Sequence, residues 1–440
     1  MSTPGHAPLH QLEAWQAARL LARREISAEQ LMRACLERIG ERDGEVQAFC
    51  HLAADAALAQ ARALDAGPWR GPLHGLPLGV KDLIDTADMP TTYGSAVYAG
   101  HRPAADAAVV ALCREAGAVL PGKTVSTEFA YFHPGPTRNP RGLGPNLYTN
   151  LYTPGGSSSG SAAAVADHML PLALGTQTAG SIIRPAAYCG VVGYKPTLGR
   201  VPRAGVKSLS ETLDVVGGFG RSVQDVALLG AVLMSDARLL QDLPDFAPRI
   251  GLCPTPEWPQ ADADVQAAWV QAVRALGPQA QHMSDAAWPQ AMPDLVALQK
   301  AVMAFEMARA LSHERLRHGA QLSTRLVDLF EQGMAISGEA HAANLSATAG
   351  ARQLADAWFE QHDVLLAPSA TGEAPAGLGA TGDPLFCRGW TLLGLPCVHL
   401  PFTHGHNGLP VGLQLIARAG DDHRLLAAAH WCWARLTQAA

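Results

Sequence analysis

Apolar residues recur at helical spacing through the first 66 residues of the chain. Leu31, Cys35 and Ile39 share one helical face. Ser27, with Gln30 three residues later, has the spacing of a capping box, which predicts that this helix begins there. An alanine-rich stretch over residues 53–66 predicts a further helix that stops before Gly-Pro. We therefore expect residues 1–66 to form a helical layer against a sheet.

After residue 75 the pattern changes to short apolar runs separated by helical stretches. The runs predict strands at 76–80, 118–120, 170–174, 249–253, 363–368 and 411–416. The intervening patterns predict helices at 106–116, 161–166, 222–236, 263–276 and 422–436. This alternation predicts an α/β fold with a mixed, mostly parallel, twisted central sheet covered by helices on both faces.

The stretch from 294 to 360 has long helical patterns, and we interpret it as a helical cap over the cleft. No internal repeat or linker interrupts the chain, so residues 1–440 are predicted to form a single domain.

Composition narrows the function classes. With 48% hydrophobic and 16% charged residues, the chain is typical of a packed globule. A net charge of −6 gives no basic footprint, so we expect no nucleic-acid partner. No apolar run approaches the ~18 residues of a membrane span, and no signal-peptide pattern stands at the start. We expect a cytoplasmic protein that does not insert in membranes.

Neither the cysteines nor the histidines form a metal-binding pattern. The eight cysteines include no Cys-x-x-Cys pair, so we expect mostly buried free thiols. The seventeen histidines include no His-Glu-x-x-His. The sequence therefore predicts no catalytic metal, and we expect no cofactor.

The chemistry is concentrated in two Gly/Ser-rich loops and one lysine. Ser157 lies in the loop 155–161, Ser181 ends the loop 175–181, and Lys81 ends a predicted buried strand. A serine hydroxyl needs a base to become a nucleophile. A lysine serves at pH 7 only as a free amine, which costs about 4.6 kcal/mol from an ordinary pKa. Burial among apolar neighbours lowers a lysine pKa, and the residues around Lys81 are apolar.

Three segments, 71–85, 153–166 and 181–197, resemble the amidase signature family of serine hydrolases, as do 394–398 and 408–414. The resemblance spans residues 10–435 and is weakest over 250–360. It implies that Ser181 is the nucleophile, that Lys81 is the base, and that Ser157, which has a cis peptide bond, relays the proton between them. It also implies an oxyanion hole made from the backbone N–H groups of this turn: Thr178, Ala179, Gly180 and Ser181.

The chain departs from the family pattern in three places. The family usually has an acid where Gln177 stands and an arginine where Ile183 stands; here Arg184 follows one place later. We hypothesise that the two changes are linked, because losing one partner of an ion pair would strand a charge. About seven residues also look inserted within 141–152, and loops beside a site often set substrate choice.

Aromatic residues in the expected cleft segments favour a small hydrophobic or aryl amide as the substrate. No arginine cluster suggests a dicarboxylate. Since the family also cleaves esters and carbamates, urethanase and esterase activities are included in this hypothesis. At family level, a homodimer is expected. The candidate substrate contacts are Phe129, Tyr131, Tyr148, Tyr152, Phe386 and Trp390.

Three other hypotheses remain open. Residues 156–160 also fit Gly-x-Ser-x-Gly, which would make Ser158 the nucleophile of an α/β-hydrolase esterase, with His399 or His423 as its histidine. The loop could instead bind phosphate, although no lysine follows Gly160 as such loops require. Within the family, the chain could be an amidotransferase subunit, a role that requires partner subunits.

Overall fold

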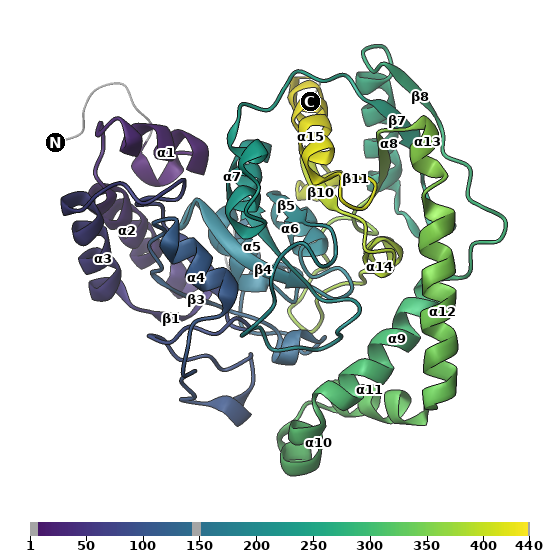
Figure 1. Ribbon diagram of the computed structural model, residues 1–440, viewed down its shortest axis with the longest axis horizontal. Coiled ribbons are helices and arrows are strands. Elements are labelled where there is room, and N and C mark those ends of the chain that lie inside the picture. The colour runs from purple at the N-terminus through teal and green to yellow at the C-terminus, as the bar shows by residue number, and fades with distance from the viewer. Residues whose placement is uncertain (1–7, 143–150, 439–440) are drawn as a thin grey trace.

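The computed structural model describes residues 8–142 and 151–438. Its centre is an 11-stranded sheet of order β1-β3-β2-β4-β6-β5-β10-β11-β9-β7-β8 (Figure 1). The strands are β1 (Phe49–Leu52), β2 (Leu78–Lys81), β3 (Gly122–Thr124), β4 (Leu172–Gln177), β5 (Val192–Lys195), β6 (Val215–Gly220), β7 (Arg249–Leu252), β8 (His282–Asp285), β9 (Val364–Pro368), β10 (Cys397–His404) and β11 (Pro410–Ile416).

The sheet is mixed and flanked by helices, as expected, but the prediction that it is mostly parallel was wrong. Neighbours pair in parallel at β3–β2, β2–β4, β9–β7 and β7–β8. The other six pairings are antiparallel. Antiparallel strands need no crossover helix. For that reason β5, β6 and β10 left no strand–helix alternation in the sequence and were missed.

Helices cover both faces of the sheet. Along β4, Leu172 and Leu174 pack into a cluster with α7 (Val223–Leu233), whereas Ala173 points to the opposite face and packs with α5 (Ser159–Ala166) and α6 (Ile183–Cys189). This alternation is the period of a strand buried on both sides. Further helices are α4 (Ala108–Glu115), α8 (Ala263–Leu276) and α15 (Asp422–Gln438).

The N-terminal helical layer consists of α1 (Ala14–Ala22), α2 (Ala28–Val46) and α3 (Ala54–Ala66), drawn in purple in Figure 1. Strand β1 lies between α2 and α3 and was not predicted. The capping box is present, because the Gln30 N–H donates to Ser27 Oγ at 3.1 Å and the Ser27 N–H donates to Gln30 Oε1 at 2.9 Å. The predicted stop of α3 before Gly67 is also confirmed.

Residues 294–360 are helical, as predicted, and lie along one side of the molecule, in green in Figure 1. They form α9 (Leu295–Ala310), α10 (Ser312–His318), α11 (Thr324–Ala335), α12 (Gly338–Ala355) and the start of α13 (Trp358–Gln361). Helix α9 packs on α14 (Leu385–Leu392). The assignment of residues 1–440 to one domain stays a prediction.

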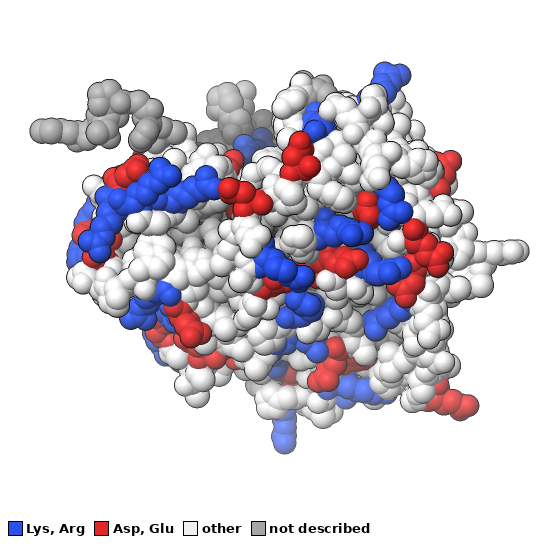
Figure 2. Space-filling model, turned by 45° about the horizontal axis from the view of Figure 1, so that its top comes forward, with Lys and Arg blue, Asp and Glu red and all other residues white. Residues whose placement is uncertain are grey.

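Three features of the described residues can be compared with the expectations from composition: membrane-spanning helices, the distribution of surface charge and the cysteines. Across residues 8–142 and 151–438, no helix has both the length and the apolarity to cross a membrane. Acidic and basic side chains are intermixed on the face shown in Figure 2. All eight cysteines are free, and all but Cys50 are buried.

Candidate active site

Lys81 ends β2 with its side chain fully buried. Its Nζ donates to Ser157 Oγ at 2.7 Å and to Thr176 Oγ1 at 2.7 Å. Burial lowers the pKa of Lys81 well below its usual value; the Asp214 carboxylate opposes this shift and the Arg184 guanidinium adds to it. A lysine with a lowered pKa and a serine hydroxyl within hydrogen-bond distance has the geometry of a base with its proton donor.

The loop before α5 holds Ser157 in place through its neighbours. The Gly156–Ser157 peptide bond is cis, and the Ser157 side chain is almost fully buried. Ser158 Oγ donates to the Thr176 carbonyl and accepts the Thr176 N–H, both at 3.3 Å. Ser158 therefore ties this loop to β4, the strand that leads to Ser181.

The esterase hypothesis lacks a histidine at Ser158. His399 is fully buried on β10, where its Nδ1 lies 2.7 Å from Ser369 Oγ, and burial lowers its pKa to about 3. His423 lies at the start of α15. No hydrogen bond joins either histidine to Ser158 in the described residues.

Gln177 holds the turn between β4 and α6. Its Oε1 accepts the N–H groups of Ile182 at 2.8 Å and Ile183 at 3.0 Å, and its Nε2 donates to Thr391 Oγ1 at 2.9 Å. A neutral amide thus supplies both an acceptor and a donor where the family usually has an acid. It fixes the backbone immediately after Ser181.

Arg184 bonds to a different set of atoms. Its guanidinium donates to the Gly156 carbonyl, from Nη2 at 2.6 Å and Nε at 3.2 Å, and also to the Gly382 carbonyl. No hydrogen bond joins it to Gln177, so no contact supports the hypothesis that the two departures compensate for each other. Arg184 instead links α6, which follows Ser181, to the peptide before Ser157.

The turn 178–181 leaves its backbone donors free. None of its four N–H groups donates to another described residue. The turn lies so close to α14 that a Cβ on Gly180 would be 2.7 Å from Pro384 Cβ and 3.0 Å from Cys387 Cβ. Free N–H groups on a tightly held turn are what an oxyanion hole needs.

Ser181 lines a narrow cavity between this turn and α9. Its side chain is 7% exposed. Thr178 and Arg184 are the other polar residues in the cavity wall. The rest of the wall is mainly apolar and consists of Ala130, Tyr131, Phe132, Ala179, Leu209, Met303, Met307 and Pro384. The structure has no hydrogen bond between Ser157 and Ser181. The two loops are connected by Ser158, which bonds to Thr176, and by Arg184, which bonds to the Gly156 carbonyl from α6.

The proposed aromatic contacts are dispersed. Tyr131 lines the Ser181 cavity. Phe129 is fully buried in the core, edge-on to Tyr98 with ring centroids 6.1 Å apart. Tyr152 pairs with Ala376 through an isolated β-bridge. Tyr148 lies outside the described residues.

Phe386 and Trp390 line a different pocket, together with Trp288. The reason is helical periodicity. Phe386 and Trp390 are four residues apart on one face of α14, while Pro384 and Arg388 share the other face. Neither residue lines the Ser181 cavity, and their contact with the substrate stays a prediction.

Sequence reasoning missed Leu209, Met303 and Met307 in the cavity wall. The two methionines are four residues apart on α9, so their shared face was visible in the sequence. The sequence did not show that this face lines the cavity of Ser181, because that depends on how α9 packs against the rest of the protein.

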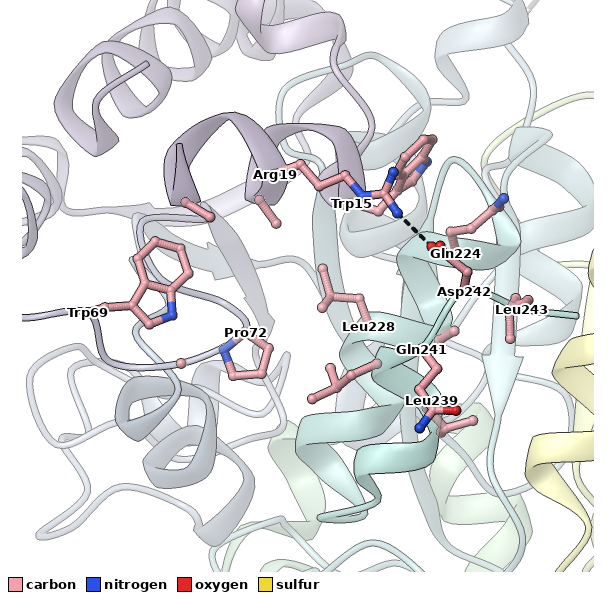
Figure 3. A pocket seen from close by; sticks show the side chains of 15 residues that line it. Trp15, Arg19, Trp69, Pro72, Gln224, Leu228, Leu239, Gln241, Asp242 and Leu243 are labelled. Carbon is pink, nitrogen blue, oxygen red and sulfur yellow. Dashed lines mark hydrogen bonds and ion pairs between the residues drawn. The ribbon is translucent and has the colours of Figure 1, made fainter. Parts of the chain in front are cut away.

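A larger hollow of about 400 Å³ lies away from this chemistry, between α1, residues 69–72 and α7 (Figure 3). Trp15 and Trp69 line it, and an ion pair of 2.5 Å joins Arg19 to Asp242 across it. It contains neither Lys81 nor the two candidate serines, so size alone does not identify the site.

One group in the described part of the chain could hold a metal ion. The ligand atoms of Asp264, Glu373 and His406 lie within 4.8 Å of one another. His406 Nδ1 already pairs with Asp264 at 2.6 Å, and this hydrogen bond raises the pKa of His406. None of the three lines the Ser181 cavity.

The family model described as Amidase matches residues 30–426. The chain belongs to the amidase family. The amidase signature resemblance is thus confirmed, and with it the assignment to a family of enzymes that hydrolyse carbon–nitrogen bonds.

Two relatives are both glutamyl-tRNA(Gln) amidotransferase subunits A. The protein from Nitratidesulfovibrio vulgaris is 35% identical over 480 residues, covering 95% of this chain and 96% of the relative. The protein from Acidothermus cellulolyticus is 48% identical over 230 residues, covering 50% of this chain and 44% of the relative.

Two solved structures share the fold. The native peptide amidase from Stenotrophomonas maltophilia has a TM-score of 0.81 and 28% identity, over 98% of each chain. An inhibitor-bound vestigial protein complex, which reveals the evolutionary origins of an s-triazine catabolic enzyme, has a TM-score of 0.86 and 28% identity. It covers 97% of this chain and 100% of its own.

Proposed function

We propose that this amidase family member hydrolyses an amide of a small molecule through an acyl-serine intermediate. The observation that carries this proposal is the 2.7 Å hydrogen bond between the buried Lys81 Nζ and Ser157 Oγ. Ser157 would pass protons between Ser181 and Lys81, a relay that needs no histidine.

In this mechanism Ser181 Oγ attacks the carbonyl carbon and gives its proton to Ser157, which gives its own to Lys81. The oxyanion accepts hydrogen bonds from the N–H groups of residues 178–181. The lysine ammonium then returns the proton through Ser157 to the leaving nitrogen, and the C–N bond breaks. A water molecule hydrolyses the acyl-serine by the same relay, which restores Ser181.

The apolar wall of the cavity supports a hydrophobic or aryl group near the scissile bond, contributed by Tyr131, Phe132 and the two methionines of α9. Esters and carbamates present the same carbonyl to Ser181, so we retain them as alternative substrates. The homodimer stays a prediction that light scattering tests, and the cytoplasmic location stays a prediction as well.

A second candidate is an amidotransferase subunit, and the names of the relatives favour it over a stand-alone hydrolase. Both candidates use the same amide-cleaving chemistry and differ in whether a partner is required. Release of amine or ammonia by the purified chain alone would support the hydrolase. Release only after a partner subunit is added would support the amidotransferase.

The relay is tested by labelling with a fluorophosphonate, followed by mass spectrometry of the tagged peptide. We expect a tag on Ser181 in the unmodified chain and none in Lys81→Ala. A tag on Ser158 would support the esterase hypothesis instead, and no tag at all would refute the serine mechanism.

A further inference from the structure

A second buried arginine lies beside the Ser181 cavity. Arg388 is only 4% exposed, and its Nε has no hydrogen-bond partner although it is buried. Burying a charged group without a partner is costly. Such a group is rarely retained in a fold without something to bind.

The side chain of Arg388 is directed to the cavity by the geometry of α14. Arg388 lies four residues after Pro384, which lines the cavity, and its N–H donates to the Pro384 carbonyl at 3.2 Å. Residues four apart share a helix face, and long side chains lean toward the helix N-terminus. The guanidinium is therefore carried back toward the cavity wall.

A hydrogen-bond chain fixes the guanidinium against that wall. Arg388 Nη1 donates to Gln299 Oε1, and Gln299 Nε2 donates to the Thr178 carbonyl at 3.0 Å. Thr178 belongs to both the cavity and the proposed oxyanion turn. Arg388 is thus held next to the reacting end of the cavity by neutral groups.

In the described part of the chain, no carboxylate forms an ion pair with either arginine at this site; burial lowers the pKa of both guanidinium groups, and the exposed Asp383 carboxylate opposes this shift from a longer distance. Among the described residues, neither Arg184 nor Arg388 has an acidic side chain within 4.0 Å. Residues 1–7, 143–150 and 439–440 contain no Asp or Glu. Arg184 already gives its donors to two carbonyls, whereas Arg388 keeps Nε unused. Arg388 is the cation available to a ligand.

We propose that Arg388 binds a carboxylate of the substrate, so that the preferred amides carry an acid group beside the scissile bond. This rests on the amide-hydrolase function proposed above and names its substrate class. Guanidinium is the group best matched to a planar carboxylate. The sequence predicted a hydrophobic or aryl amide and showed no arginine cluster, because Arg184 and Arg388 lie far apart along the chain.

The test compares matched substrates that differ only in charge. Succinyl p-nitroanilide has a carboxylate where butyryl p-nitroanilide has a methyl group, and 4-acetamidobenzoate is the charged counterpart of 4-methylacetanilide. We expect the unmodified chain to favour at least one acid in kcat/KM. In Arg388→Met that acid-to-neutral ratio should fall about tenfold or more, the scale of one charged hydrogen bond.

Two further variants separate binding from folding. Arg388→Lys keeps the charge and should restore part of the ratio. Arg352→Met removes a half-buried arginine that donates to the Leu392 carbonyl, and should leave the ratio unchanged. Equal loss on acid and neutral substrates in Arg388→Met, or a preference for the neutral member of both pairs, overturns the proposal.

The results expected if the hydrolase proposal fails differ from those expected if the carboxylate-site proposal fails. If no anilide is cleaved, protection of Ser181 from the fluorophosphonate by succinate or by 4-acetamidobenzoate still reports binding. We expect protection in the unmodified chain and little in Arg388→Met; no protection by either acid refutes the carboxylate site. If Ser181 takes no label at all, the hydrolase function fails, and calorimetric titration with the same two acids decides the carboxylate site alone.

Discussion

Replacing Lys81 by methionine should make the protein more stable at neutral pH while abolishing hydrolysis. Lys81 is fully buried, and among the residues that the structure describes it forms no ion pair with an acidic side chain; its Nζ bonds to two hydroxyl groups. Holding a lysine as a free amine at pH 7 costs about 4.6 kcal/mol, taking ~1.36 kcal/mol per pKa unit below 10.4. Methionine occupies a similar volume without that cost.

The variant also loses the hydrogen bonds to Ser157 and Thr176, at about 1 kcal/mol each. The net expectation for Lys81→Met at pH 7 is a gain of about 2–3 kcal/mol in the free energy of unfolding. The pKa of Lys81 is lowered in the folded state, so below its ordinary pKa the unfolded chain binds a proton that the folded chain lacks. Stability of the unmodified chain should therefore rise with pH. Its deficit relative to Lys81→Met should close at about pH 9, where the cost of the free amine equals the two lost hydrogen bonds, and should reverse by about pH 10.

The assay is urea unfolding of both proteins between pH 6 and pH 10. Lys123 provides a matched control, because it is equally buried but forms an ion pair with Asp82 at 3.5 Å. Lys123→Met strands that carboxylate and should lose about 3–5 kcal/mol. If Lys81→Met is less stable than the unmodified chain at pH 7, with a gap that does not change with pH, then Lys81 is charged in the folded protein and the base assignment fails.

Asp214→Asn should shift the acid limb of the kcat/KM profile to lower pH, because the carboxylate raises the pKa of Lys81; an unmoved limb would contradict this influence. Gly180→Ala should lower activity at least about tenfold, since its Cβ would lie 2.7 Å from α14, while Gly350→Ala, with no atom within 4 Å, should keep activity and raise Tm slightly. Ser158→Ala should reduce activity and Tm without abolishing turnover, because Ser158 only ties its loop to β4; complete loss with an unchanged fold would favour the esterase mechanism.

Local features such as helix caps and helix ends could be predicted from the sequence. Features that depend on how distant segments of the chain pack together could not. The Ser27 cap, the end of α3 and most helix bounds follow from spacing within a few residues. The missed strands β5, β6 and β10 have no such signal, and β6, with three glycines in six residues, does not look like a strand at all.

The same division holds at the candidate site. Loops with repeated Gly and Ser mark where Ser157 and Ser181 lie, and a short apolar run marks the strand that ends at Lys81. The side chains of Lys81 and Ser157 do meet. The part of the cavity wall that α9 supplies could not be predicted, because Met303 and Met307 reach it only through the packing of α9 against its neighbours. Residues chosen for aromatic character alone, such as Trp390, faced the other side of their helix.

Helix α9 lines the Ser181 cavity but carries none of the three candidate catalytic residues. Met303 and Met307 come from the stretch that least resembles the rest of the family, whereas Lys81, Ser157 and Ser181 come from the segments that resemble it most. Methionine is unbranched and adapts its shape to what it packs against. A library of substitutions on this face of α9 would therefore explore new substrates while leaving the reaction itself untouched.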